Sequence, residues 1–341
     1  MDTSSLMPSP LTVAAVLPCY KAKEHVLGVL SAMPAIVNRI YCVDDACPEA
    51  TGRHIEANMT DSRVRVIYHT ANTGVGGAMC TGYEAALADG ADIIVKIDSD
   101  GQMDPQAIPY LIAPIVGGMA DYAKGNRFSN IEDVSSMPVA RLVGNAGLSF
   151  LTKVSTGYWN IFDPTNGYTA VHARVLERIP LRKLSRRYFF ESDLLFRLGT
   201  ISARVVDIPM AAIYGDEVSN LKITSVLFPF FVKNMRNSFK RIIYNYFLRD
   251  FSVGSVYLVL GLLLLLGGGT LGTFFWVHGI IINRAATAGQ VMFSALPVIF
   301  GAQLLVAFTS YDIGRTPSTA LHPLLSRLRS STLPAADSIS R

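Results

Sequence analysis

The stretch that decides the fold is Asp92-Ile-Ile-Val-Lys-Ile-Asp-Ser-Asp-Gly-Gln-Met-Asp-Pro105. Its apolar run from Ile93 to Ile97 predicts a short buried strand. Two acids one residue apart, Asp98 and Asp100, follow that strand directly. Open α/β sheets bind ligands beyond the carboxyl ends of their parallel strands, and carboxylate oxygens suit Mg²⁺ or Mn²⁺. We therefore expect a metal ion carrying a diphosphate at this corner.

Short apolar runs alternate with stretches of helical length from Val13 to about residue 125. This alternation predicts an α/β domain with a mostly parallel, doubly wound, Rossmann-like sheet. After Asn126 the pattern changes to mixed helices and strands, beginning with a polar loop at Phe128–Pro138. The expected strands are Val13–Leu17, Ile40–Val43, Val64–Tyr68, Ile93–Ile97, Thr169–His172 and Arg204–Ile208. The expected helices are Val26–Met33, Ala50–Met59, Val75–Ala88, Pro105–Val116, Val139–Thr156 and Ser192–Leu198.

The composition indicates membrane segments beside a soluble domain. With 341 residues, the chain can hold one sizeable domain plus an appendage, or two domains. Only 16% of the residues are charged, which is low for a wholly soluble protein. The formal net charge of +4 is too small to argue for a nucleic-acid partner.

The cysteines and the N-terminus exclude other classes of protein. The four cysteines show no CxxC pair and no histidine at metal-binding spacing, so we expect free thiols rather than a zinc site. Met1–Pro10 lacks the basic and apolar regions of a signal peptide. We therefore expect the N-terminal domain to remain in the cytosol.

Two uncharged stretches, Phe251–Val277 and Ala285–Tyr311, predict a membrane hairpin joined by His278–Arg284. Each is long enough to cross a hydrocarbon core of about 30 Å at about 1.5 Å per residue. Basic residues crowd the two outer flanks, so the positive-inside rule places both flanks in the cytosol. They are Lys233, Arg236, Lys240, Arg241, Arg249, Arg315, Arg327 and Arg329.

The segment before the hairpin carries apolar residues at helical spacing, with basic residues between them. This pattern is typical of an amphipathic helix on a membrane surface, although an ordinary packing helix also fits it. We thus expect a cytosolic domain over residues 1–220, an amphipathic helical region over 221–250 and a two-helix hairpin over 251–312. A mobile cytosolic tail would follow over 313–341.

Other polar residues should reach the same sheet edge as the acid pair. Pro18 and Tyr20 close the first strand and can form one wall of a base pocket. Asp44 and Asp45 close the second strand, where a carboxylate can accept a hydrogen bond from a base or a ribose. A helix cap or an Asx turn is the alternative for these two acids.

Glycines precede the third helix in Asn72-Thr-Gly-Val-Gly-Gly77. They predict backbone N–H groups that approach an anion, as at other helix starts. The stretch is not a P-loop, because no Gly-Lys-Ser/Thr follows. The acid stretch is not an EF-hand either, since Gly101 is fourth and Pro109 twelfth from Asp98.

Taken together, these motifs resemble family 2 glycosyltransferases of the GT-A fold. Within that family the chain is similar to dolichol- and polyprenyl-phosphate sugar transferases, which can carry a C-terminal membrane hairpin. The resemblance covers about residues 11–215 and, by architecture, the region to residue 311. It implies a nucleotide site and a metal site. The implied nucleotide residues are Pro18, Tyr20, one of Asp44 or Asp45, Gly74, Asp98 and Asp100, and the implied metal ligands are Asp98, Asp100 and Gln102.

The resemblance also implies catalytic residues on the acceptor side. Arg127, in Lys124-Gly-Asn-Arg127, would meet a phosphate group, and Arg141 would meet the lipid phosphate. An acid near the acceptor would be Asp163, Glu191 or Asp193, and the sequence leaves that choice open. The family's Pro-x-Tyr-Asn-Glu pattern is interrupted here, because Lys21-Ala-Lys23 separates Tyr20 from Glu24.

The function implied is inverting transfer of a sugar from a UDP- or GDP-sugar to a polyprenyl or dolichyl phosphate. The implied partners are the nucleotide sugar, the lipid acceptor and membrane lipids, with no nucleic acid. Mg²⁺ or Mn²⁺ would be the cofactor, and self-association stays open. The location would be the cytosolic face of a membrane, the inner membrane in a bacterium.

Two alternatives stay open. The enzyme would instead extend a lipid-linked saccharide or another hydroxyl acceptor during synthesis of cell-surface polysaccharide. A non-catalytic subunit with a degenerate transferase domain is disfavoured, because the acidic residues are intact.

Overall fold

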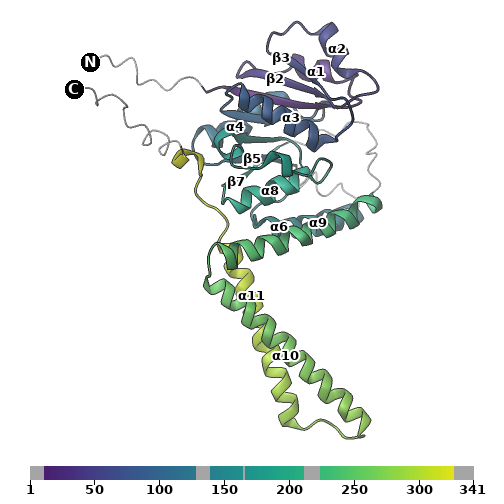
Figure 1. The fold of residues 1–341 in the computed structure, drawn as a ribbon, viewed down its shortest axis with the longest axis vertical. Helices are drawn as coiled ribbons and strands as arrows, with labels where there is room; N and C mark the ends of the chain where they lie inside the picture. Colours follow the sequence, from purple (N-terminus) through teal and green to yellow (C-terminus); the bar gives the residue numbers. More distant parts are fainter. Residues whose placement is uncertain (1–10, 128–138, 164–165, 211–222, 326–341) are drawn as a thin grey trace, which may run out of the picture. The chain divides into compact units, whose positions relative to one another are not determined.

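The computed structural model describes residues 11–127, 139–163, 166–210 and 223–325 (Figure 1). The chain forms two compact units. Unit 1 takes in the chain up to Asn237 and again from Pro317, and unit 2 is Ser238–Thr316. The predicted N-terminal segment and the predicted loop at Phe128–Pro138 lie outside the described residues.

The predicted elements of unit 1 occur in the predicted order with shifts at their ends, and β5, α7 and η3 are additional. The strands are β1 Val13–Cys19, β2 Val37–Asp44, β3 Val64–Tyr68, β4 Ile93–Lys96, β5 Tyr122–Asn126, β6 Thr169–His172 and β7 Val205–Pro209. The helices are α1 Val26–Ser31, α2 Thr51–Asn58, α3 Val75–Ala88, η2 Pro105–Ala107, α4 Ile108–Val116, α6 Val139–Thr156, α7 Ala173–Leu176, η3 Leu181–Lys183 and α8 Phe190–Thr200. Helix α9, Ile223–Ile243, runs from unit 1 into unit 2.

The seven strands of this sheet are ordered β3-β2-β1-β4-β6-β5-β7. Neighbours pair in parallel except for β6, which is antiparallel to both β4 and β5. The predicted mixed α/β sheet with mostly parallel strands is therefore confirmed. Strand β5 was not predicted, because Tyr-Ala-Lys-Gly-Asn has no apolar run; its position between β6 and β7 supplies the hydrogen bonds.

Two apolar layers cover the two faces of the sheet. On one face, Val16 of β1 and Tyr83 of α3 belong to a buried cluster that also includes Phe190 of α8. On the other face, Leu17 packs in a second cluster with residues of α1 and α4. Alternate residues of each strand thus enter opposite layers, and the ends of the strands are left to carry polar chemistry.

Two predicted helices differ from the structure at their starts. The predicted helix Pro105–Val116 begins as the short 3-10 helix η2, where the Asp104 carboxylate accepts the Gln106 N–H at 2.9 Å. The predicted helix Ser192–Leu198 begins earlier, at Phe190. The earlier start of α8 brings Glu191 into its first turn.

The start of the predicted mobile tail instead returns to unit 1. The Asp121 carboxylate accepts N–H groups from Leu321 and His322 at 2.7 to 2.9 Å, and His322 Nδ1 lies 2.9 Å from it. The His322 ring stacks on His172, and Leu325 is buried in the core. The prediction of mobility is therefore wrong for this segment, since a buried carboxylate needs donors and these backbone N–H groups supply them. The remaining tail, 326–341, lies outside the described residues.

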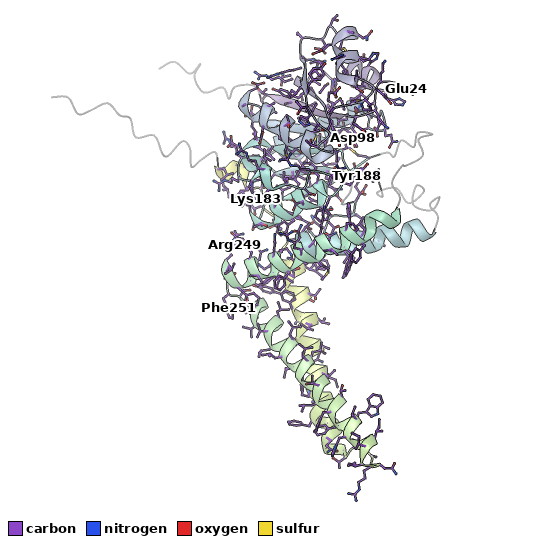
Figure 2. The ribbon with its side chains drawn as sticks, turned by 45° about the vertical axis from the view of Figure 1, so that its right-hand side comes forward. Glu24, Asp98, Lys183, Tyr188, Arg249 and Phe251 are labelled. Carbon is purple, nitrogen blue, oxygen red and sulfur yellow. The ribbon has the colours of Figure 1, made fainter. Side chains whose placement is uncertain are left out.

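In unit 2, the short π-helical turn η4 Tyr244–Leu248 precedes α10 Val253–Ile281 and α11 Ala288–Gly314. The two long helices pack against each other, and both are long and apolar enough to cross a membrane. Nearly all their side-chain sticks are carbon in Figure 2. Gly301 is needed for this packing, because a Cβ there would lie 2.6 Å from the Leu265 backbone nitrogen.

One basic residue of the predicted membrane-surface helix has another role. Arg241 is 4% exposed and makes a bidentate ion pair with Asp312 of α11, at 2.7 and 2.9 Å. The Tyr246 hydroxyl donates to the same carboxylate at 2.6 Å. Arg241 therefore fastens α9 to the base of the hairpin instead of facing lipid headgroups.

Candidate active site

The carboxyl ends of β1, β2 and β4 meet at one edge of the sheet, as the sequence predicts. Cys19 of β1 pairs with Asp44 of β2, and Val16 pairs with Lys96 of β4. The Ser99 hydroxyl, just beyond β4, donates to the Pro18 carbonyl at 2.8 Å. The loops after these three strands therefore lie side by side.

Lys96 joins two of the predicted acids. Its ammonium lies 2.7 Å from Asp98 Oδ1 and 3.4 Å from Glu191 Oε1. The ammonium also donates to the Gly167 carbonyl at 3.1 Å. The Lys96 side chain is 1% exposed, whereas the Asp98 side chain is 30% exposed (Asp98 is labelled in Figure 2). A buried cation thus holds an acid that still reaches the surface.

The Lys96 ammonium stays charged in this setting. Burial alone would lower its pKa, but the Asp98 and Glu191 carboxylates raise the pKa of Lys96 above its ordinary value. Burial disfavours the charged form of Glu191 as well and therefore raises the pKa of this acid, while the Lys96 ammonium opposes that rise. Lys96 and Glu191 therefore influence each other's charge through their ion pair.

Gly167 permits this arrangement. A Cβ at this position would lie 2.3 Å from the Lys96 ammonium and 2.7 Å from Asp98 Oδ2. Real Cβ atoms do not come that close to other heavy atoms, so any side chain here would push the pair apart. The loop before β6 is therefore shaped around the Lys96–Asp98 contact.

The acid corner fits a divalent cation held jointly with a diphosphate. Asp98 and Asp100 offer hard carboxylate oxygens at the strand end, and the Gln102 N–H donates to Asp100 Oδ1 at 3.0 Å. Within the described ranges, no three His, Cys, Asp or Glu side chains form a complete metal cage. Mg²⁺ commonly takes one or two carboxylates and completes its shell with water and substrate phosphates, which matches this donor set.

A second charged pair lies at the end of β5. Asp163 is 1% exposed and accepts from Arg127 Nε at 2.9 Å and from its NH2 group at 3.2 Å. Burial would raise the pKa of Asp163, but Lys124 and Arg127 lower it below its ordinary value. Asp163 is therefore ionised and paired. The Arg127 side chain, 41% exposed, is accessible to a ligand.

A buried polar row connects the two charged pairs across the sheet. Lys96 and Lys124 both pair with Thr169 of β6, from either side, and Lys124 pairs with Asp207 of β7. Side chains paired in this way project from the same face of a sheet. The row faces α8, because Glu191 of that helix reaches Lys96.

The two acids at the carboxyl end of β2, Asp44 and Asp45, already accept hydrogen bonds from other parts of the chain. Asp44 accepts from the Cys47 and Gly52 N–H groups, each at 2.7 Å. Asp45 accepts from the Thr73 and Gly74 N–H groups at 2.8 and 2.7 Å. Each side chain is almost fully buried. Asp45 Oδ1 also lies 2.7 Å from His69 Nδ1. The described contacts of Asp44 bind the start of α2 and those of Asp45 bind the loop before α3, and a contact with the nucleoside stays a prediction.

Backbone N–H groups at the glycine-rich start of α3 also donate hydrogen bonds to other parts of the chain. Gly74 gives its N–H to Asp45, and Gly77 gives its N–H to the Arg186 carbonyl at 3.1 Å. A Cβ on Gly76 would lie 2.1 Å from the Ser185 carbonyl oxygen. The Gly74 and Gly77 N–H groups are therefore bound within the chain, and their contact with a ligand anion stays a prediction. The glycines instead let the segment before α8 pack directly on α3.

The two acids of α8, Glu191 and Asp193, contact different partners. Glu191 faces Lys96, whereas Asp193 accepts the Ser185 N–H at 2.9 Å and lies 3.4 Å from Arg197. Residues two apart on a helix do not share a face, which explains the difference. Asp193 therefore holds the turn before α8. The structure assigns Arg141 to α6 without describing its side chain.

The first strand ends in an exposed aromatic residue. Tyr20 is 47% exposed, and the Lys21 ammonium lies 5.8 Å from the centre of its ring. Lys21 has a φ of +56°, so the chain turns sharply after Tyr20 and leads away toward the exposed Glu24. Tyr20 is thus open to a flat ligand such as a base.

Sequence reasoning missed Lys96, Lys124 and Gly167. A usable signal existed for Lys96, because a lysine inside Ile-Ile-Val-Lys-Ile interrupts a buried strand. A buried lysine needs an acid beside it, so its position already pointed to Asp98. Lys124 and Gly167 gave no comparable signal, since their burial depends on how β5 and β6 pair.

Comparison with known proteins agrees with this geometry. The family model described as glycosyl transferase family 2 matches residues 15–180. The UDP-N-acetylglucosamine–dolichyl-phosphate N-acetylglucosaminyltransferase of Methanococcus voltae is 34% identical over 168 residues, 49% of this chain and 66% of its own length. The undecaprenyl-phosphate mannosyltransferase of Micrococcus luteus is 29% identical over 204 residues, 59% of this chain and 83% of its own. The chain thus spans just under two thirds of the first relative.

A solved structure supports the fold. Glucosyl-3-phosphoglycerate synthase from Mycobacterium tuberculosis, crystallised with Mn²⁺, UDP and phosphoglyceric acid, has a TM-score of 0.50 to this chain. The similarity covers 68% of this chain and 78% of the synthase, at 18% identity. At that identity the likeness concerns the arrangement of helices and strands.

Proposed function

Since residues 15–180 of this chain form a glycosyltransferase family 2 domain, we propose that the chain moves a sugar from a UDP- or GDP-sugar to a polyprenyl or dolichyl phosphate. The reaction takes place at the cytosolic face of a membrane and inverts the anomeric carbon. The observation that carries the proposal is the acid pair Asp98 and Asp100 beyond β4, at the edge where open sheets bind ligands. Both relatives named above are transferases to a polyprenyl-type phosphate by name.

The donor binds at the acid corner. Asp98 and Asp100, with Gln102 beside them, would hold Mg²⁺ or Mn²⁺ together with the diphosphate, and Tyr20 would stack on the base. A bound divalent ion supplies positive charge that stabilises the leaving nucleoside diphosphate. Pro18 contributes to the wall of the base pocket through its fixed position beside Ser99.

The acceptor binds on the side of β5. A lipid phosphate is ionised near neutral pH, so its oxygen attacks the anomeric carbon without a base. Arg127 is accessible and charged, and it would orient the acceptor phosphate or the leaving diphosphate while Asp163 fixes the guanidinium. In this scheme Asp163 positions Arg127 and removes no proton.

The two apolar helices of unit 2 would span the membrane, with their ends near Arg241 and Arg315 in the cytosol. A long-chain phosphate cannot leave the bilayer, so a membrane-anchored enzyme has access to it where a soluble one does not. This location also favours an acceptor held in the membrane over a soluble one.

A second candidate function is extension of a lipid-linked saccharide at a hydroxyl group. Glu191 supports it, because a hydroxyl acceptor needs a general base and Glu191 is a buried acid whose pKa is raised by burial. The first function is preferred because Lys96 keeps Glu191 engaged in an ion pair.

The test is a panel of UDP- and GDP-sugars incubated with the purified full-length protein in detergent or vesicles. One arm contains polyprenyl phosphate, one a lipid-linked saccharide and one no acceptor. Formation of a sugar-phosphate-lipid in the first arm alone supports the proposal. Turnover in the second arm alone supports the saccharide-extending function, and no turnover in any arm contradicts both.

A further inference from the structure

A single buried cation links the two halves of the candidate site. Lys96 lies between Asp98, which belongs to the donor corner, and Glu191 of α8, one of the acids that the resemblance implies near the acceptor. Both contacts are made by one ammonium group that is nearly inaccessible to water. The backbone at Gly167 lies so close to the ammonium that any side chain at this position would collide with it.

The position of this cation has an electrostatic consequence. A positive charge 2.7 Å from Asp98 Oδ1 neutralises part of the acid corner before any ligand arrives. A divalent cation that binds Asp98 must compete with the ammonium for the same carboxylate. The diphosphate of a donor adds negative charge and shifts that balance toward the metal ion.

From these contacts we propose that Lys96 is a positioning residue which fixes Asp98 and Glu191 as one unit and makes metal binding depend on the donor diphosphate. The inference rests on the proposed function, because it takes the acid corner to be the site of the metal and the diphosphate. It adds that the site holds little metal until the nucleotide is present. Lys96 itself touches no substrate in this scheme.

A merely structural lysine would behave differently when replaced. If Lys96 only supported the fold, Lys96→Met would loosen the corner, and both metal binding and transfer would weaken. If Lys96 competes with the metal, the same substitution removes a repelling charge and frees Asp98. Binding of metal without nucleotide then becomes tighter while transfer becomes slower, because Asp98 and Glu191 lose their common anchor. The two effects have opposite signs.

The experiment measures Mn²⁺ binding to full-length protein by electron paramagnetic resonance, with and without UDP and GDP. For wild type, we expect weak binding of Mn²⁺ alone and clearly tighter binding with one nucleotide. For Lys96→Met, we expect Mn²⁺ alone to bind at least about three-fold tighter and the nucleotide to add less. At saturating Mn²⁺, kcat for transfer should fall at least about ten-fold.

Two further variants keep the test independent of folding. Lys96→Met combined with Glu191→Gln removes both charges of one pair, so it should fold where the single variant is destabilised, and it should retain the tighter Mn²⁺ binding. Gly167→Ala leaves the charges in place but displaces the ammonium from Asp98, and should tighten Mn²⁺ binding in the same direction. Thermal unfolding of each protein reports whether it is folded.

The outcomes separate the inference from the proposed function. Wild-type protein that shows no Mn²⁺ binding with either nucleotide contradicts the proposed metal site itself. Wild-type protein that binds Mn²⁺ with a nucleotide, together with folded Lys96 variants that bind Mn²⁺ equally or more weakly, overturns the role given to Lys96 and leaves the proposed function standing.

Discussion

The two ends of the sheet in unit 1 each carry a buried or half-buried acid. The two acids differ in their exposure and in the groups that bind them. Asp121, before β5, is fully buried and accepts N–H groups from Leu321, His322 and Arg204. Asp98, beyond β4, is paired with Lys96 and remains 30% exposed. Fixed backbone donors leave no room for a ligand, whereas an exposed carboxylate beside one cation can exchange partners. The first acid holds structure, and the second is suited to chemistry.

The same contrast occurs at the carboxyl edge itself. Asp45 is bound by the Thr73 and Gly74 N–H groups and so resembles Asp121 in its surroundings, although only β1 separates its strand, β2, from the strand β4 that leads to the acid corner. Location at the edge is therefore not enough to assign a ligand. The number and type of groups already bound to each carboxylate distinguish the two classes.

The largest effect on activity is expected at Asp100, and its absence would contradict this comparison. Asp100→Asn removes a charge from the acid corner and should lower transfer by at least about 100-fold, because the developing charge of the diphosphate loses its counterion site. The measurement is the rate of sugar-lipid formation at saturating donor. Asp104→Asn is the matched control, since asparagine also caps η2, and it should stay within about three-fold of wild type. Full activity of the Asp100 variant would contradict the metal role.

A smaller loss is expected at the second charged pair. Arg127→Met leaves Asp163 buried without its partner and removes the accessible guanidinium, so kcat/KM should fall about 10- to 100-fold. Arg127→Lys keeps the charge but not the bidentate geometry and should recover part of the rate. Steady-state kinetics with donor and acceptor varied separately would show which substrate Arg127 meets. Equal rates for all three proteins would remove Arg127 from the site.

At Asp121 we expect the opposite result, a loss of stability with little loss of activity. Asp121→Asn places an amide against backbone N–H donors and should lower the free energy of unfolding by about 1–3 kcal/mol, because buried donors lose their acceptor. Activity below the unfolding transition should remain near wild type. Thermal denaturation in detergent, followed by an activity assay at low temperature, checks both parts. A large loss of activity with unchanged stability would mean that the opposite end of the sheet takes part in the reaction.

The smallest effect is a dependence of stability on pH at His172, whose ring stacks on His322 of the C-terminal segment. Burial, with His322 and Arg174 nearby, lowers the pKa of His172 to about 4. The folded pKa lies below the unfolded value of about 6.5, so the unfolded chain binds the proton first and stability falls as the pH drops from about 6.5 to about 4. Between pH 7 and 5.5 the loss should be about 1 kcal/mol.

His172→Asn tests that assignment. Asparagine can still accept the Arg174 N–H that caps α7, but it does not titrate. The stability of this variant should therefore depend less on pH over the same interval, as measured by thermal unfolding at a series of pH values. An unchanged pH dependence would mean that another group is responsible.

The sequence alone determined the local parts of this protein. The β1 to β4 alternation, the acid corner after Ile97 and the two apolar helices all follow from patterns a few residues to some thirty residues long. Such patterns report burial and turn chemistry directly, because each residue's preference is read within its own segment. The acid pair could be found in this way since strand and turn are adjacent in the chain.

Tertiary structure decided which polar groups are free and which are bound. The partners of the Asp45 carboxylate lie 24, 28 and 29 residues away, those of Asp121 lie 83, 200 and 201 residues away, and Glu191 approaches Lys96 of β4 from helix α8. Strand β5 owes its existence to pairing with β6 and β7, and only that pairing buries Lys124. A carboxylate's role depends on the donors that the fold brings to it, and those donors come from segments that no local pattern connects.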